Sequence, residues 1–201
     1  MASSQLSEEI AASAARLVVE EGMEYGPAKR RAARDLGRRS GRGTELPDNE
    51  AVEDEVRAYL ELFCADTQPA ELAALRRLAL AWMQRLAEFR PHLAGAVWRG
   101  TATRLNNVHI ELFADDSKAA EIALLDRRIA FDVDSTTGLR GMPVDVLSIA
   151  TPCPELGEPV TLNLIVLDHD DLRGALKTDA RGRSHRGDLA ALQRLLAAPA
   201  P

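Results

Sequence analysis

The chain has 201 residues, of which 46% are hydrophobic, and a formal net charge of −6. This length suits one domain, or a compact core with an appended helical part, and the negative charge argues against general nucleic-acid binding by bulk electrostatics. Cys64 and Cys153 are too few for a disulfide framework and predict reduced thiols. No apolar run approaches the roughly 18 residues of a membrane span. The start, MASSQLSEE, lacks the basic and apolar regions of a signal peptide, so we expect a cytoplasmic protein without a membrane partner.

Two short helices are predicted at the N-terminus. Ser7 is a candidate cap for the first helix, which ends near Gly22, and a second, basic helix follows over about 27–36. Two such helices can resemble a helix-turn-helix, but alanine and arginine alone show no base-reading pattern, so a solvated basic helix is the simpler interpretation. Residues 37–48 lack periodicity and predict a linker. Residues 1–47 therefore form a helical segment with a basic linker.

A helical hairpin is predicted over residues 48–90. Asp48 caps a third helix that runs to about Phe63, and the sequence from Asp66 caps a fourth that Pro91 ends. The fourth helix has apolar residues at steps of three and four, namely Leu72, Leu75, Ala79, Trp82, Leu86 and Phe89. The short connection predicts an antiparallel pair, with Trp82 buried between the third and fourth helices.

From Pro91 the apolar period changes from helical spacing to alternation, which indicates strands. Five strands are predicted, over about 93–98, 108–113, 129–133, 144–149 and 160–167. Helices are predicted from the cap at residues 115–117 to about residue 127, over residues 172–177 and over residues 188–197. Residues 178–187 are predicted to form a polar, mobile segment. The expected fold class is α+β, with N-terminal helices packed on a mixed sheet of about five strands within residues 91–201.

The most chemically suggestive stretch runs from Leu93 to Asp116. It holds a Gly-Thr turn at Gly100 and Thr101, and then an alternating strand, Val108–Phe113. Side chains two apart on a strand point the same way. The alternation therefore predicts His109 and Glu111 side by side, on the face opposite to the buried one.

This order of elements resembles the nucleotidyltransferase superfamily of the DNA-polymerase-β type, over about residues 93–167. In that family a Gly-Ser or Gly-Thr pair ends the first strand and approaches the nucleotide triphosphate. A later strand carries alternating acids, and another strand supplies a third acid. By this resemblance Gly100 and Thr101 match the glycine–hydroxyl pair, and His109 and Glu111 fall on the alternating acids. Asp145 resembles the third acid, and Asp132 is a weaker candidate.

The resemblance implies a nucleotide site with Mg²⁺ held by Glu111 and Asp145, and with phosphate paired to Arg99 or Arg104. The chemistry needs two Mg²⁺ ions with oxygen ligands, and an imidazole at position 109 suits them poorly. The loop before His109 is also short for the family. We therefore expect weak, altered or lost nucleotidyl transfer, with Mn²⁺ better able than Mg²⁺ to accept the nitrogen ligand.

Other interpretations stay open at this point. The protein is alternatively a non-catalytic interaction protein whose N-terminal helices bind a protein, a second copy or a nucleic acid, the last through basic residues of 29–34 and 38–42. His109 and Glu111 then form a strand side without a role. The sequence Asp168–Asp171 looks like a metal cluster, although helix capping explains it equally well. The transferase hypothesis requires Thr101, Glu111 and Asp145 to converge on one cleft.

Overall fold

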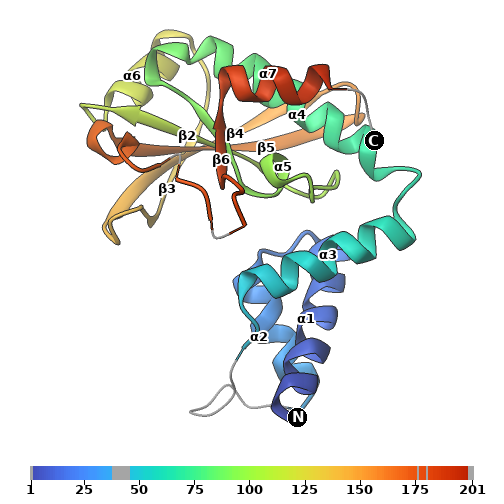
Figure 1. Cartoon of the computed structure of the whole chain (residues 1–201). Coiled ribbons are helices and arrows are strands. Elements are labelled where there is room, and N and C mark those ends of the chain that lie inside the picture. The colour runs from blue at the N-terminus through green and yellow to red at the C-terminus, as the bar shows by residue number, and fades with distance from the viewer. Residues whose placement is uncertain (1, 38–45, 176, 180, 199–201) are drawn as a thin grey trace. The chain divides into compact units, whose positions relative to one another are not determined.

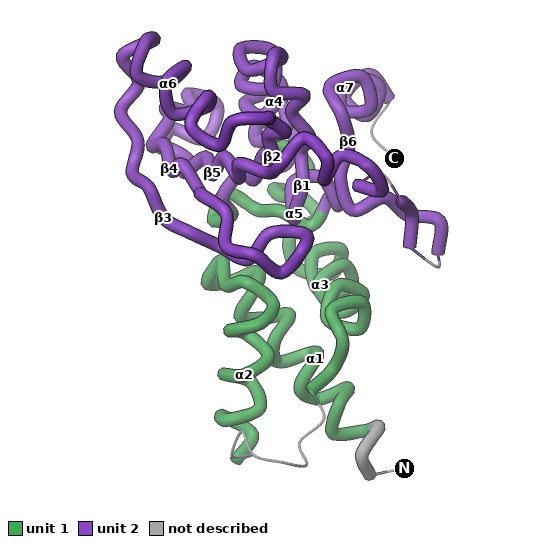
Figure 2. Tube along the Cα trace, turned by 90° about the vertical axis from the view of Figure 1, so that its left-hand side faces the viewer, with its two compact units in different colours: residues 1–70, 101–106 green, residues 71–100, 107–201 purple. Residues whose placement is uncertain are grey.

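The computed structural model describes residues 2–37, 46–175, 177–179 and 181–198 (Figure 1). Within these residues the chain is α+β, as predicted, with helices in its N-terminal part and a mixed sheet in the remainder. It divides into two compact units (Figure 2). Unit 1 comprises residues 1–70 and 101–106, and unit 2 comprises residues 71–100 and 107–201. These boundaries differ from the segment ends expected near residues 47 and 90.

Unit 1 is built on three helices, α1 (Ala2–Glu21), α2 (Tyr25–Asp35) and α3 (Asn49–Phe63). α1 packs against both of the others, through a core of small and branched apolar residues that includes Ile10, Ala14, Val18, Ala32, Val52 and Val56. The Asp48 side chain accepts a hydrogen bond from the Ala51 N–H at 2.7 Å, which confirms the predicted cap of α3. Ser7 lies inside α1 rather than at its start.

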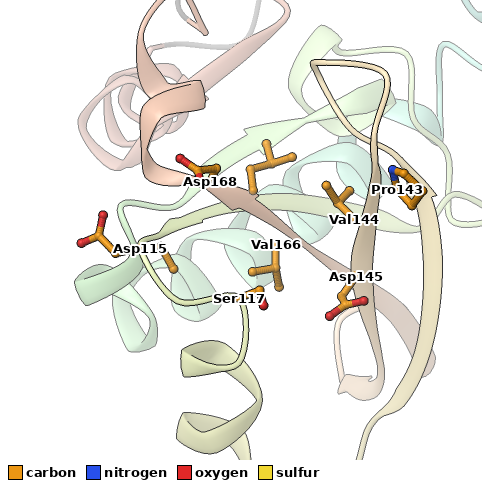
Figure 3. A pocket seen from close by; sticks show the side chains of 9 residues that line it. Asp115, Ser117, Pro143, Val144, Asp145, Val166 and Asp168 are labelled. Atoms are coloured by element: carbon orange, nitrogen blue, oxygen red, sulfur yellow. The ribbon is translucent and has the colours of Figure 1, made fainter.

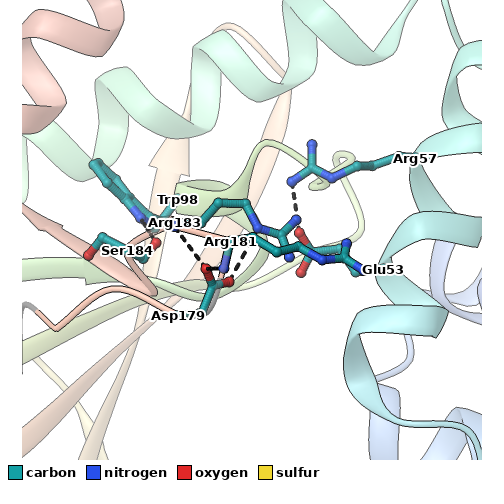
Figure 4. Close-up of polar contacts among 7 residues, drawn as sticks. All are labelled: Glu53, Arg57, Trp98, Asp179, Arg181, Arg183 and Ser184. Carbon is teal, nitrogen blue, oxygen red and sulfur yellow. Dashed lines mark hydrogen bonds and ion pairs between the residues drawn. The ribbon is translucent and has the colours of Figure 1, made fainter.

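Two basic residues of α2 are engaged within unit 1. Lys29 Nζ donates to the Pro47 carbonyl at 2.9 Å and to Asn49 Oδ1 at 2.8 Å, and Arg31 pairs with Glu21. On α3, Glu53 is buried and pairs with Arg57 at 2.8 Å (Figure 4). The predicted basic residues 38–42 lie outside the described part of the chain. These pairings support the interpretation of α2 as a structural helix.

The described residues of unit 2 form a six-stranded sheet in the order β3-β4-β5-β2-β1-β6. β2 and β5 are parallel, and the other neighbours are antiparallel. The strands are β1 (His92–Ala94), β2 (Val108–Ala114), β3 (Asp132–Thr137), β4 (Pro143–Cys153), β5 (Glu158–Asp168) and β6 (Arg186–Asp188). The helices are α4 (Gln68–Arg85), α5 (Gly95–Arg99), α6 (Ala119–Asp126) and α7 (Leu189–Ala197), with short 3-10 turns η1 (Ala87–Phe89) and η2 (His169–Leu172).

Several predicted strands have different ends in the structure. The apolar run 93–98 was predicted as one strand, which was wrong, because Gly95 has a φ of +70° and opens α5 directly after β1. Ile129 was predicted in a strand, but its N–H closes the end of α6 by donating to the Leu124 carbonyl at 3.0 Å, next to Arg128 at a φ of +55°. β3 therefore begins later, at Asp132.

The C-terminal part also departs from expectation. β4 and β5 run into the predicted proline loop and leave a turn over residues 154–157. The predicted helix 172–177 is replaced by η2, which comes earlier in the chain. The segment 178–187, predicted as polar and mobile, holds a bridge between Thr178 and Ser184 and the start of β6. The last helix is confirmed, and Asp188 caps it by accepting from the Ala191 N–H at 2.8 Å.

One face of the sheet, here called the helix-covered face, carries the main core. Its inward side chains alternate along the strands and include Val108, Ile110, Leu112, Leu147, Leu162 and Leu164, all fully buried. Trp82 of α4 packs on this face, and its Nε1 donates to Thr151 Oγ1 of β4 at 3.2 Å. The predicted position of Trp82 between two hairpin helices was therefore wrong. Its burial was predicted correctly, but against β4.

Candidate functional site

The strand register decides whether the two predicted metal ligands meet. Directly paired residues of neighbouring strands point to the same face of a sheet. Glu111 pairs with Ile165, and Ile165 pairs with Val146, so these three side chains share one face, here called the polar face. Asp145 precedes Val146 on β4 and therefore points to the opposite, helix-covered face. Glu111 and Asp145 therefore do not converge on one cleft, so they form no joint metal site and the requirement of the transferase hypothesis is not met.

Asp145 lines a pocket of about 420 Å³ at the carboxyl ends of the parallel strands β2 and β5 (Figure 3). The pocket also contains Asp115, Ser117 and Asp168. Lys118 Nζ lies 3.1 Å from Asp145 Oδ2 and neutralises it. Across the described parts of the chain, no group of three or more His, Cys, Asp or Glu residues is arranged to hold a metal ion.

The sequence Asp168–Asp171 is explained by local structure. The Asp168 side chain accepts a hydrogen bond from the Asp170 N–H at 2.7 Å and so caps η2. Asp171 pairs with Arg140 at 2.5 Å, and His169 Nδ1 lies 3.8 Å from Asp115. The carboxylates are therefore used as a helix cap and in an ion pair rather than gathered round one point. This supports capping over the metal cluster that the sequence also allowed.

Glu111 is the best-defined charged group of the polar face. It is 7% exposed, and its Oε2 lies 2.7 Å from Arg186 Nε in an ion pair. Arg186 is held from its other side, because its Nη1 donates to the Ala175 carbonyl at 2.8 Å. Burial raises the pKa of Glu111, and the neighbouring Arg186 charge acts in the opposite direction. The expected solvent-facing strand side is thus buried at this position.

A row of polar residues crosses the same face next to Glu111. The register aligns Ser148, Asn163 and His109 on neighbouring strands β4, β5 and β2. Ser148 Oγ donates to Asn163 Oδ1 at 2.9 Å, so the two N–H groups of Asn163 Nδ2 remain without a hydrogen-bond partner among the described residues. A Cβ at Gly95 would lie 3.3 Å from the His109 ring, which explains a glycine there.

The predicted phosphate-binding residues are divided between the units. Gly100 ends α5 with a φ of +85°, and it therefore follows a helix rather than a strand. Arg99 is the last residue of the same helix, in unit 2. Thr101 and Arg104 belong to unit 1. The Thr101 hydroxyl is buried, and its Oγ1 has no hydrogen-bond partner among the described residues.

Arg186 and the Ser148–Asn163 pair were not predicted from the sequence. Asn163 carried a signal, because it interrupts the apolar strand 160–167 on the face that also holds Ile165. Arg186 carried no such signal, because it stands in a polar segment that is far from Glu111 in the sequence. Its position depends on the segment before it (Figure 4). There the Trp98 Nε1 donates to the Ser184 carbonyl at 2.8 Å, and the Asp179 side chain accepts hydrogen bonds from the backbone N–H groups of Arg181 and Arg183.

Gly187 of β6 explains how this segment fits on the sheet. A Cβ at Gly187 would lie 2.1 Å from the Trp98 indole, so that only a glycine lets the ring cover the strand. The Trp98–Gly187 contact thereby sets β6, and with it Arg186, beside β1. Arg186 is paired in register with Ala94, whose other neighbour is His109.

Neither the protein-family models nor the curated proteins compared with the chain gave a match. No helix in the described ranges is long and apolar enough to cross a membrane.

Proposed function

We propose that the protein is nucleotidyltransferase-like and binds a nucleotide on the polar face of unit 2 without a metal ion, having lost nucleotidyl transfer. The observation that carries this proposal is the Glu111–Arg186 ion pair at 2.7 Å. A carboxylate that binds Mg²⁺ must offer its oxygens to the ion, but Arg186 already neutralises this one. With Asp145 on the opposite face, the remaining residues do not fit a two-metal centre.

The order of elements supports the likeness to the family. β1 is followed by a glycine, then by α5 and by β2 with His109 and Glu111. The resemblance places its glycine at the end of the first strand, and in this fold Gly95, not Gly100, stands there. The next residue is Ala96, which has no hydroxyl. The glycine position is thus kept and Glu111 remains an acid, while the hydroxyl is absent and His109 stands in place of the first acid, as expected of a protein without the metal chemistry.

The polar face offers hydrogen-bond donors to a ligand. Asn163 has two amide N–H groups without a partner in the described ranges, and it is paired in register with His109, while Arg186 brings a guanidinium whose charge is shared with Glu111. Phosphate oxygens accept hydrogen bonds from such groups and need no metal where the donors are in place. Arg99 of the same unit remains the proposed phosphate partner. The roles of Gly100, Thr101 and Arg104 stay predictions.

Amide-to-acid variants test the site. Asn163→Asp replaces the free donors by a carboxylate that repels phosphate, while Gln193→Glu makes the same change on an exposed position of α7. ATP is titrated into each full-length variant in EDTA by calorimetry. We expect saturable binding by the native protein and by Gln193→Glu, and at least a tenfold loss for Asn163→Asp, or about 1.4 kcal/mol. Equal affinity in all three proteins, or ATP binding that requires Mg²⁺, would contradict the proposal.

A transfer assay tests the loss of catalysis. Native protein with labelled ATP and Mg²⁺ or Mn²⁺ is expected to label no acceptor above background. His109→Asp alone is expected to leave Mg²⁺ affinity unchanged, because Arg186 still occupies Glu111. Robust Mg²⁺-dependent transfer that Glu111→Ala abolishes would show that an active centre exists.

The alternative function, a protein interaction through the N-terminal helices, is favoured by one observation. Leu62 and Phe63, at the end of α3, are 73% and 65% exposed. Large adjacent apolar side chains on a surface are a feature of interaction sites. If this surface joins two copies of the chain, sedimentation should show a dimer that Leu62→Asp with Phe63→Asp converts to a monomer. A monomer at all concentrations would exclude this self-association.

A further inference from the structure

Unit 2 has a second hollow that the proposed nucleotide site does not use. It measures about 490 Å³ and lies beside β1 and the start of α7. Its walls are mainly apolar and include Ala87, Pro91, His92, Leu172, Leu189 and Ala190. The volume is within the range of about 300–1,000 Å³ that small-molecule sites occupy. Neither Asn163, His109, Glu111 nor Arg186 lines it.

His92 is a buried polar residue in the lining of this pocket. The residue is 5% exposed, and its Nδ1 lies 2.8 Å from the Arg90 carbonyl oxygen. A carbonyl only accepts hydrogen bonds, so Nδ1 carries the hydrogen and Nε2 has a lone pair. Burial lowers the pKa of His92, which keeps the ring neutral near pH 7. None of the described residues donates a hydrogen bond to Nε2.

The backbone holds His92 in this tautomer at a conformational cost. Arg90 has a φ of +48°, in the left-handed region that residues other than glycine rarely adopt. It also precedes Pro91, which restricts its backbone further. This conformation places the Arg90 carbonyl against Nδ1, and the His92 and Phe113 rings form a T-shaped contact with centroids 5.2 Å apart. Strained backbone of this kind gathers at ligand sites.

We propose that this pocket binds a small, uncharged ring compound with one N–H or O–H donor, which donates to His92 Nε2. The apolar walls suit the body of such a ligand. The charged residues of the pocket, Arg90 and Asp188, have opposite signs, and the Asp188 carboxylate already accepts from the Ala191 N–H at 2.8 Å. The pocket therefore favours a ligand without net charge. This distinguishes its ligand from a nucleotide, which is negatively charged.

Indole and 1-methylindole test the proposal, because they differ in the single N–H donor. Each is titrated into full-length protein labelled with ¹⁵N, and the backbone and His92 ring signals are followed by NMR. Indole should bind saturably and shift the Nε2 signal of His92. Without the donor, 1-methylindole should bind about 2- to 10-fold more weakly, the value of one net hydrogen bond. Equal affinities, or no saturation by indole up to its solubility, would overturn the proposal.

A pocket-filling variant locates the site. Ala190 is exposed at the pocket rim, so Ala190→Trp should fill the space without disturbing the core. Gln193→Trp places the same side chain on an exposed position of α7 that does not line the pocket. We expect indole binding to be lost in the first variant and retained in the second. Retained binding in Ala190→Trp, with the His92 signal still shifted, would show that the ligand lies elsewhere.

Discussion

The two faces of strand β2 show how differently one strand can be used. On the helix-covered face, Val108, Ile110 and Leu112 are fully buried among other aliphatic side chains. On the polar face, Glu111 is also buried, but it forms an ion pair with Arg186, which comes 75 residues later (186 − 111). On this strand the first face is wholly aliphatic, whereas the second combines the polar residues His109 and Glu111 with Phe113, which packs in an apolar cluster with Leu167 and Ala175. Changes on the two faces should therefore have different consequences.

The largest effect is expected on the helix-covered face. Trp82→Ala should lower the free energy of unfolding by about 3–5 kcal/mol, because the indole is buried and also donates to Thr151. Trp82→Phe keeps a buried aromatic ring but loses the hydrogen bond and part of the buried volume, so a smaller loss of about 1–3 kcal/mol is expected. Chemical denaturation measures both. A loss below about 1 kcal/mol for Trp82→Ala would mean that α4 does not contribute to this core.

The next largest effect is expected at the ion pair. Glu111→Ala leaves Arg186 without its counter-charge and should cost about 3 kcal/mol, near the lower end of the range for buried pairs, since each side chain keeps about a tenth of its exposure. Glu111→Leu combined with Arg186→Met should recover much of that loss. The double-mutant cycle measures the coupling directly. Additive single losses would show that the two groups do not interact.

A smaller effect is expected along the polar row. Ser148→Ala removes the hydrogen bond to Asn163 and should cost about 1 kcal/mol. The same variant frees Asn163 Oδ1, so the orientation of the amide is no longer fixed. Nucleotide affinity should therefore fall in calorimetry even though the stability changes little. Thr161→Ala, an exposed change on the same strand, serves as the control. Unchanged nucleotide affinity in Ser148→Ala would remove this row from the site.

The smallest expected effect is on the pH dependence of the free energy of unfolding. Burial lowers the pKa of His92 below its ordinary value of 6.5, so the unfolded chain binds this proton more readily than the folded chain. The stability contribution is therefore complete above pH 6.5 and is lost as the pH falls through the folded pKa. Below pH 6.5, the free energy of unfolding should fall more steeply with decreasing pH in the native protein than in His92→Gln. Parallel curves would contradict the buried, neutral state of His92.

Part of this organisation could be predicted from local sequence. Asp48 was recognised as a helix cap, the last helix was expected over about residues 188–197, and the alternation of Val108–Phe113 predicted the strand that carries the candidate site. These features depend on spacing within a few residues, which a sequence displays directly. The α+β class follows from the same periodicities.

The site itself could not be predicted, because it depends on register and on distant segments. Shifting a residue by one position along a strand moves it to the other face, and no local signal placed Asp145 on the face opposite to Glu111. Gly95 was hidden inside an apolar run that is equally compatible with a strand. Arg186 reaches Glu111 only because Trp98 covers Gly187 and sets β6 beside β1.

The central claim is that Arg186 takes the place of a metal ion at Glu111, and Mn²⁺ binding tests it most directly. Electron paramagnetic resonance of a Mn²⁺ titration counts the bound ions in native protein and in Glu111→Gln. The two proteins should give the same titration, so that any weak binding at other carboxylates, such as those of the pocket around Asp145, cancels in the comparison. A saturable Mn²⁺ site present in native protein and absent in Glu111→Gln would contradict the account.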